Sequence, residues 1–252
     1  MLKVKNLSCK YNRTPVLKDV TFSVEPNEKL CILGPNGSGK TTLLKAISCL
    51  IPSNGEIFLD NSNLKDAKRK EISKKIALMS QMSTIYFPYT VYETVMLGRY
   101  AHIKRGVFQT ESSTDKEIVL DCLEKTGIVD IKDRLITELS GGQLQRVFLA
   151  RVFAQSPQII LLDEPTNHLD LKYQIELTEY LNEWASKEDH CVIGVLHDIN
   201  LALSFANKVI LLNNGEIAAY SRAEDFNLNL LNDIYKIDIK KYMVNSLKKW
   251  EQ

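Results

Sequence analysis

Apolar residues recur along the chain in short runs, and their spacing predicts strands near the amino terminus and again in the second half. Residues 2–8 and 16–24 alternate between apolar and polar positions, as half-buried antiparallel strands do. Three other runs are mostly apolar, as strands buried on both faces of a parallel sheet are: 29–33, 159–162 and 191–196. This order predicts an α/β protein with an antiparallel sheet at its start.

Between about residues 82 and 156 the pattern has a helical period instead. Apolar positions spaced for one helix face occur in three stretches: 91–99, 114–126 and 142–155. We therefore expect a helical insertion between two strands of the parallel sheet. Asn213-Asn214-Gly215 predicts a hairpin turn, and the tail from about residue 227 is expected to be helical or irregular.

Composition narrows the class of protein. With 252 residues and 44% hydrophobic content the chain can bury a full core. Its 32 basic and 31 acidic residues give a net charge of +1, so nothing indicates a nucleic-acid partner. The five cysteines include no C-x-x-C pair, which argues against a zinc site or a disulfide framework. No signal peptide and no apolar run of about 20 residues stand out, so we expect a soluble cytosolic chain.

Residues 34–42 read GPNGSGKTT and match the phosphate-binding pattern G-x-x-x-x-G-K-[ST] between a predicted strand and a predicted helix. Glycines let backbone N–H groups face one anion, Lys40 supplies charge to the β- and γ-phosphates, and Thr41 can ligate Mg²⁺. A glycine-rich turn that matches by chance is the alternative, but the flanks disfavour it. The pattern predicts nucleotide binding by Gly34, Pro35, Asn36, Gly37, Ser38, Gly39, Lys40, Thr41 and Thr42.

Polar side chains follow the apolar runs where strands end. Asp163 follows the run 159–162 and suits a second Mg²⁺ ligand, and Glu164 could accept a proton from a water that attacks the γ-phosphate. His197 and Gln81 also follow predicted strands, so both can reach the phosphates or the metal. Solvated acids, a structural histidine and a surface glutamine are the alternative interpretations.

Two further features become candidate nucleotide-binding residues once a phosphate loop is predicted. Leu139-Ser140-Gly141-Gly142-Gln143 opens a predicted helix with an N-cap serine and two glycines, which makes a second helix start fit for an anion; an ordinary capped helix is the alternative. Tyr11 lies in a predicted loop, where it could stack on a flat base or simply pack.

Together these marks, in this order, resemble the nucleotide-binding subunit of ABC transporters across nearly the whole chain. The resemblance implies an ATPase with a P-loop NTPase (RecA-like) core, an antiparallel β subdomain and an inserted helical subdomain. It divides the single domain into a core of residues 1–81 and 157–226, a helical subdomain of residues 82–156 and a tail of residues 227–252. A nucleotide kinase with the same loop would leave LSGGQ and His197 without a role.

The resemblance also implies the roles of single residues. Tyr11 becomes the adenine-stacking aromatic, Gln81 the Q-loop residue, Asp170 the D-loop acid and His197 the switch histidine. Lys40, Glu164, His197 and Gln81 then form the catalytic set, and Thr41, Asp163 and Gln81 hold Mg²⁺.

The partners follow from the same family. Two copies pack head to tail around two ATP molecules, so that the partner's nucleotide meets this chain's LSGGQ residues, Ser140, Gly141, Gly142 and Gln143. The homodimer drives a membrane permease from the cytoplasmic face of the inner membrane, and an extracytoplasmic binding protein supplies the substrate.

A finer likeness is to the ATPases of iron-siderophore, haem and cobalamin importers, carried by residues 90–102, 166–170 and 197–202. Zinc or manganese importers are the next alternative, and a non-transport ABC ATPase in an assembly or mechanical role is a third. Tandem cassettes or long heptad repeats would favour the third, and the sequence has neither. Asn27, Ser80 and Leu144 depart from the residues usual in the family.

Overall fold

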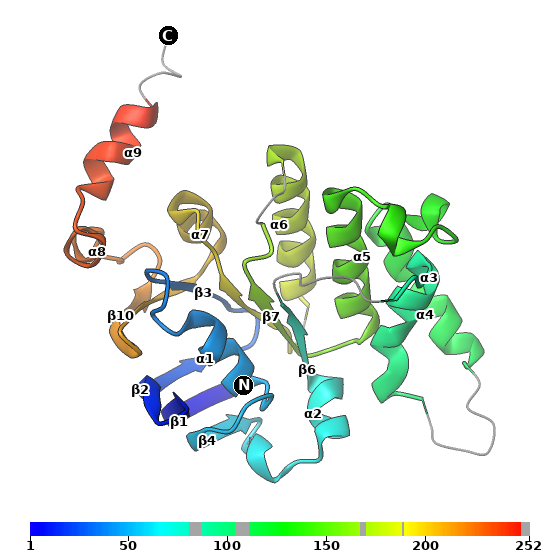
Figure 1. Ribbon diagram of the computed structural model, residues 1–252, viewed down its shortest axis with the longest axis horizontal. Helices are drawn as coiled ribbons and strands as arrows, with labels where there is room; N and C mark the ends of the chain where they lie inside the picture. Colours follow the sequence, from blue (N-terminus) through cyan, green and yellow to red (C-terminus); the bar gives the residue numbers. More distant parts are fainter. Residues whose placement is uncertain (81–86, 104–110, 167–169, 188, 248–252) are drawn as a thin grey trace.

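The structure is a computed structural model, and it describes the following parts of the 252-residue chain: residues 1–80, 87–103, 111–166, 170–187 and 189–247. Two sheets with helices between and around them form the body (Figure 1). The predicted α/β class is therefore confirmed. Gln81, the proposed Q-loop residue, lies outside the described residues.

The first sheet is antiparallel throughout, in the order β2-β1-β4-β5. Its strands are β1 (Leu2–Tyr11), β2 (Thr14–Val24), β4 (Asn54–Leu59) and β5 (Ser62–Asn63). The predicted antiparallel sheet is confirmed, but Tyr11 does not lie in a loop. It is the last residue of β1 and pairs with Thr14, because Asn12 and Arg13 both adopt positive φ and close a turn of two residues.

The second sheet has the order β10-β9-β3-β8-β7-β6. Its strands are β3 (Lys29–Leu33), β6 (Ile76–Met79), β7 (Ile159–Asp163), β8 (Cys191–Val195), β9 (Lys208–Asn213) and β10 (Glu216–Arg222). All neighbours pair in parallel except β9 and β10, which form the predicted hairpin. Because β3, β8, β7 and β6 are consecutive in the sheet, the residues that follow them emerge side by side at one edge.

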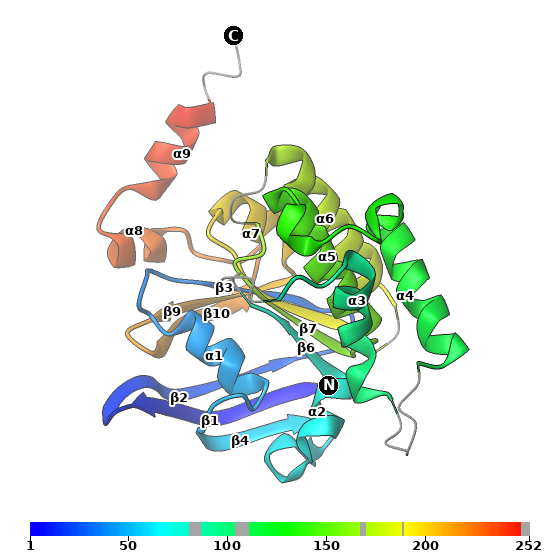
Figure 2. The ribbon, with the colours of Figure 1, turned by 45° about the vertical axis from the view of Figure 1, so that its right-hand side comes forward.

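Each central strand of this sheet faces two cores. Ile159 and Leu161 of β7 pack into a core shared with the antiparallel sheet and helix α1 (Lys40–Ile47), which lies between the two sheets (Figure 2). Ile160 and Leu162 pack on the other face, against α5 (Gly141–Ala154), α6 (Leu171–Ala185) and α7 (Ile199–Phe205). A strand that is buried on both faces has apolar residues at every position, which is the pattern in the sequence.

The predicted helical insertion is confirmed in outline. Helices α3 (Val91–Met96), α4 (Ser113–Lys125) and α5 enclose a third core. Val91, which opens α3, and Ser113, which opens α4, follow capping boxes at Thr90 and Ser112. Helix α5 belongs to two cores, since Leu149 faces the sheet and Val147 faces α3 and α4. The domain boundaries at residues 81, 156 and 226 stay a prediction.

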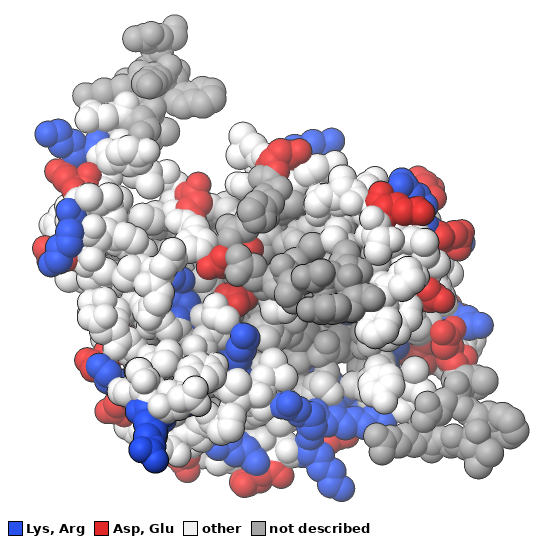
Figure 3. All heavy atoms as spheres, in the orientation of Figure 1, with Lys and Arg blue, Asp and Glu red and all other residues white. Residues whose placement is uncertain are grey.

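The remaining helices lie at the periphery. Helix α2 (Arg69–Lys75) follows the antiparallel sheet, and its basic side chains account for part of the Lys and Arg along the lower edge in Figure 3. Helices α8 (Asn229–Tyr235) and α9 (Ile239–Leu247) form the tail, and α9 projects away from the body (Figure 1). Among the described residues, no helix combines the length and the apolarity that crossing a bilayer demands.

Candidate active site

A cleft of about 500 Å³ opens where β3, β7 and β8 end. It is lined by Tyr11, Val16, Asn36, Gly37, Gly39, Lys40, Thr41, Thr42, Glu164 and His197. The structure therefore brings the predicted phosphate loop, the predicted general base and the predicted switch histidine to one place. In the sequence, Glu164 follows the loop by more than 120 residues and His197 follows it by more than 150. The adjacency of the three parallel strands brings them together.

The phosphate loop depends on glycine where the chain passes closest to its neighbours. Gly34 has φ 147°, and a Cβ there would lie 2.1 Å from the carbonyl oxygen of Leu212 in β9. Gly39 has φ 105°, and a Cβ there would lie 2.9 Å from the side chain of Leu17. A larger residue at either position would have to displace a neighbouring strand, so both glycines are needed for the shape of the loop.

Lys40 is buried inside the loop it follows. Its Nζ donates hydrogen bonds to the carbonyl oxygens of Gly34 (2.8 Å) and Pro35 (3.0 Å). Burial lowers the pKa of Lys40, while the carboxylates of Glu164 and Asp163 oppose that shift. The ammonium group thus sits among weak neutral acceptors, where a polyanion would bind it more strongly.

The hydroxyl of Ser38 supports the same conclusion. Its Oγ is buried and has no hydrogen-bond partner within the described part of the chain. A buried hydroxyl without a partner costs free energy unless a ligand supplies one. A phosphate oxygen at this loop would do so, and the residues present therefore fit a nucleotide.

Thr41 and Asp163 form the part of the site that suits a metal. Thr41 Oγ1 donates a hydrogen bond of 3.0 Å to Asp163 Oδ1. Burial raises the pKa of Asp163, Thr41 opposes that rise, and nearby Glu164 adds to it. A hydroxyl beside a carboxylate fits Mg²⁺, which is usually held by one or two protein oxygens together with phosphates and water. No cluster of three or more His, Cys, Asp or Glu among the described residues forms a metal cage.

Glu164 and His197 face each other across the cleft. His197 Nε2 lies 2.5 Å from Glu164 Oε1, and the exposed fractions of the two side chains are 41% and 15%. Glu164 has φ 55°, a left-handed conformation that is unusual for this residue type, and its N–H donates to Val195 O of β8. Strained backbone of this kind is concentrated at functional sites. The strain turns Glu164 out of the strand direction that Asp163 still follows.

The predicted LSGGQ residues Ser140 to Gln143, called the signature residues below, lie elsewhere. Ser140 caps α5 in a capping box with Gln143, and Gly141 has open space around it. Asp170 caps α6 and accepts a hydrogen bond from the N–H of Tyr173. Ser140, Gly141, Gly142, Gln143 and Asp170 are all absent from the lining of the phosphate cleft. One chain thus presents two separate sets of predicted site residues.

Three contacts to the phosphate loop escaped sequence reasoning. Val16 lines the cleft, and Gly215 of the β9–β10 turn donates its N–H to Ser38 O while passing too close to Val16 for any side chain. Tyr235, at the end of α8, lies close to the backbone of Gly34; burial raises the pKa of Tyr235, and the polar backbone of Gly34 opposes that rise. The Asn-Gly turn was visible as a hairpin signal, but nothing in the sequence indicated that it braces the loop.

Comparison with known proteins identifies the family. The family profile described as ABC transporter matches residues 17–167, which is more than half of the chain. This chain belongs to the ABC transporter family. It is the ATP-binding subunit of such a transporter, an ATPase whose hydrolysis of ATP powers transport.

Individual relatives agree with this assignment. An uncharacterized ABC transporter ATP-binding protein of Methanocaldococcus jannaschii is 38% identical over 94% of this chain and 92% of its own length. The ferric enterobactin transport ATP-binding protein of Escherichia coli is 37% identical over 86% of this chain and 80% of its own.

A solved dimer of an ATP-binding cassette, in a post-hydrolysis state with ADP and Pi, has a TM-score of 0.77 and 32% identity. It covers 90% of this chain and 100% of the solved chain. The predicted ABC ATPase fold, with its antiparallel β subdomain and helical subdomain, is confirmed.

Proposed function

We propose that this ABC ATPase energises the import of an iron-siderophore complex, haem or cobalamin through a separate membrane permease. Relatives named for such substrates support the proposal: the E. coli protein named for ferric enterobactin and the hemin import ATP-binding protein of Vibrio parahaemolyticus are each 37% identical to this chain. The ATPase would act at the cytoplasmic face of the membrane, and an extracytoplasmic binding protein would deliver the substrate. A solved ABC transporter in an inward-facing conformation, with a TM-score of 0.80, supports the pairing with a permease.

In this proposal the active form of the protein is a homodimer. The supporting observation is that the two predicted sets of site residues lie apart on one chain. The phosphate cleft holds Lys40, Glu164 and His197 but none of the signature residues, Ser140 to Gln143. Two copies placed head to tail would let the signature helix start of each copy meet the nucleotide of the other. ATP would then favour the closed dimer, because its γ-phosphate binds both copies only in that state.

Each residue of the cleft would have its own role in ATP hydrolysis. Lys40 would exchange the carbonyl oxygens of Gly34 and Pro35 for the β- and γ-phosphates and, with the loop amides, stabilise charge in the transition state. Thr41 and Asp163, with Gln81, would hold Mg²⁺ directly or through water. When bound, the metal would supply positive charge to the phosphates.

Proton transfer falls to Glu164, which would accept the proton of the water that attacks the γ-phosphate. His197, now in contact with Glu164, would hold that carboxylate in place and position the γ-phosphate. Tyr11 lines the cleft and is 47% exposed, so its ring would be able to stack on adenine. The acid in the D-loop, Asp170, would face the partner's site with the signature residues.

The test of the shared site is ATP-dependent dimerisation of Glu164→Gln protein, followed by light scattering. Glutamine keeps the shape of Glu164 but cannot act as the base, so ATP should bind, hydrolysis should stall, and a dimer should form only with ATP. The double variant Lys40→Ala, Glu164→Gln is the control and should remain monomeric. A Glu164→Gln protein that binds ATP but remains a monomer at every concentration would refute the homodimer.

The substrate class needs a separate test in cells that lack this gene. Uptake of labelled iron-siderophore, haem and cobalamin should fall for at least one substrate and return with the wild-type gene but not with the Glu164→Gln gene. Loss of zinc or manganese uptake instead would assign the chain to a metal-ion importer. Unchanged uptake of all five, with no membrane protein copurifying, would favour a non-transport ATPase.

A further inference from the structure

The signature helix α5 and the helix α6 that follows the D-loop run side by side (Figures 1 and 2). The ring of Tyr173, near the start of α6, lies against Gly142, near the start of α5. A Cβ added to Gly142 would lie 3.1 and 3.2 Å from two carbon atoms of the Tyr173 ring. A Cβ added to Gly141, one residue earlier, would meet nothing within 4 Å. The backbone of the signature motif therefore rests on Tyr173 at Gly142.

The same ring is held by a charged partner. The guanidinium carbon of Arg146, one turn along α5 from Gly142, lies 4.4 Å from the centroid of the Tyr173 ring. Arg146 also forms an ion pair with Glu176, one turn along α6 from Tyr173. A cation over a ring and an ion pair with restricted exposure together fix the relative position of two helices better than either does alone.

Both ends of the D-loop segment, at Pro165 and Asp170, are hydrogen-bonded to residues of α5 and α6. Gln145 Nε2 of α5 donates a hydrogen bond of 2.5 Å to the carbonyl oxygen of Pro165, which directly follows Glu164. At the other end, Asp170 accepts a hydrogen bond of 3.0 Å from the N–H of Tyr173 itself. A movement of α5 would therefore carry the D-loop acid with it.

We infer that Tyr173 is a positioning residue that holds the signature motif and Asp170 in one fixed spacing, so that the partner's nucleotide meets both as a unit. This inference rests on the proposed shared site, and it names the residue that sets its geometry. The aromatic face is the required feature, because it is the face that touches Gly142 and lies under Arg146. The phosphate cleft of the same chain does not include Tyr173, so nucleotide binding by a single copy should not depend on it.

The test uses two substitutions in the Glu164→Gln background. Tyr173→Leu removes the flat face, and the protein concentration needed for half-maximal ATP-dependent dimerisation should rise at least tenfold. Tyr173→Phe keeps the face and should stay within twofold of the parent. In both variants the affinity of the monomer for a fluorescent ATP analogue should change less than twofold.

A matched control separates positioning from general packing. Leu181→Val removes one methylene from a buried side chain of the same helix, far along α6 from Gly142. It should lower the unfolding temperature and leave dimerisation within twofold of the parent. If Tyr173→Leu does not fold, Arg146→Met tests the same contact from the other side and should raise the half-maximal concentration about threefold.

The outcomes distinguish the two proposals. Normal dimerisation of Tyr173→Leu or of a well-folded Arg146→Met overturns the role of Tyr173 and leaves the shared site intact. An equal loss in Leu181→Val and Tyr173→Leu, at an equal loss of unfolding temperature, reduces Tyr173 to a packing residue. A Glu164→Gln parent that never dimerises overturns the shared site and with it the inference.

Discussion

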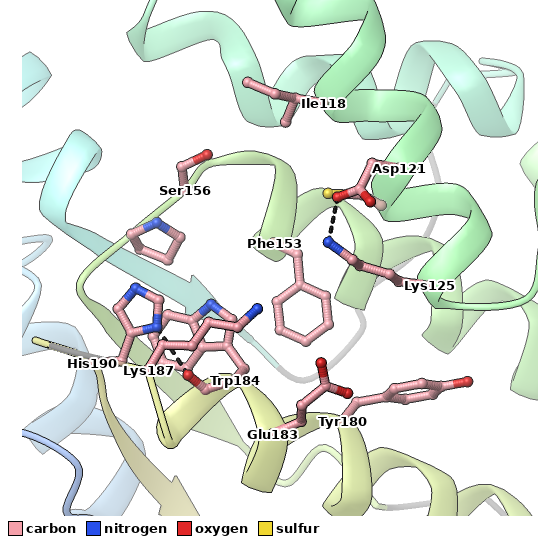
Figure 4. A pocket seen from close by; sticks show the side chains of 12 residues that line it. Ile118, Asp121, Lys125, Phe153, Ser156, Tyr180, Glu183, Trp184, Lys187 and His190 are labelled. Carbon is pink, nitrogen blue, oxygen red and sulfur yellow. Dashed lines mark hydrogen bonds and ion pairs between the residues drawn. The ribbon is translucent and has the colours of Figure 1, made fainter.

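Two clefts of nearly equal size lie beside the parallel strands, at opposite ends of them. The phosphate cleft, about 500 Å³, includes residues that follow β7 and β8, namely Glu164 and His197. The second cleft, about 510 Å³, lies between α4, α5 and α6 and includes residues that precede the same strands, Pro157 and His190 (Figure 4). The volumes of the two clefts therefore do not show which of them binds a nucleotide.

The polar groups distinguish the two. In the second cleft, Lys125 pairs with Asp121, and His190 Nδ1 donates to the carbonyl oxygen of Trp184 (Figure 4). The rings of Trp184 and His190 are stacked with centroids 4.0 Å apart. The phosphate cleft instead includes Glu164, whose backbone is left-handed, and the loop that borders it contains Ser38, whose buried hydroxyl has no hydrogen-bond partner among the described residues. A buried hydroxyl without a partner favours a ligand at the first cleft.

Among substitutions that test this difference between the clefts, we expect the largest effect to be a loss of ATP hydrolysis on changing the first cleft. Lys40→Ala removes the lysine of that lining, and ATP hydrolysis should fall by at least about 10²-fold because a preorganised charge on the phosphates is lost. Phosphate release measures the rate. Lys125→Ala in the second cleft is the matched control and should keep the rate within twofold; an equal loss there would contradict the distinction.

The next effect is loss of stability in the second cleft. Trp184 is 9% exposed and packs between His190 and Phe153, so Trp184→Ala should lower the free energy of unfolding by about 3–5 kcal/mol. Urea denaturation measures this. The folded variant should bind ATP with an affinity within twofold of wild type. A large loss of ATP affinity in protein that is fully folded would show that the second cleft takes part in nucleotide binding.

A smaller effect, of the opposite sign, is expected at Asp163. Burial raises the pKa of Asp163 in the folded protein, so protonated Asp163 contributes stability below its unfolded pKa, and that contribution is lost as pH rises through the raised folded pKa. At pH 8, without nucleotide or metal, Asp163→Asn should therefore raise the melting temperature, by about 2–4 °C.

The gain at Asp163 should shrink as pH falls towards about 4, the usual pKa of an unfolded aspartate. Thermal melts of both proteins across pH 4–8 measure it. The stabilisation that Mg²⁺ and ATP give to the wild type should be weakened in the variant. A gain that persists unchanged at pH 4 would mean that the charge of Asp163 is not its cause.

The smallest effect is expected at the rim of the second cleft. Asp121 and Lys125 form an ion pair whose side chains are about half exposed, so Asp121→Asn should cost only about 0.2–0.5 kcal/mol of unfolding free energy. Raising the salt concentration should remove most of that difference, since salt screens exposed charges. ATP hydrolysis should not change. A cost above 2 kcal/mol would mean that the second cleft depends on this pair.

Much of the site was predictable because its signals are local. Gly34, Lys40 and Thr41 stand in one short motif, and Asp163 and Glu164 directly follow an apolar strand. Parallel strands deliver their following residues to one edge, so the sequence also indicated that His197 would approach the phosphate loop. The structure places it there, in contact with Glu164.

Other features were not predictable because they join elements far apart in the chain. Tyr11 was expected in a loop and instead ends β1, since a two-residue turn holds it in the ladder. Tyr235 reaches Gly34 from about 200 residues away, and Tyr173 supports Gly142 from another helix. Neither aromatic has a motif or a period around it that indicates its partner.

The sequence by itself determined the fold class, the phosphate loop and the acidic residues beside it, because hydrophobic period and short motifs act over a few residues. Only the tertiary structure decided the strand order that assembles the cleft and the contact of Glu164 with His197. The same holds for the packing of the Tyr173 ring against Gly142 and Arg146. These depend on how separate surfaces pack together, and packing is selected by shape and burial across the whole molecule.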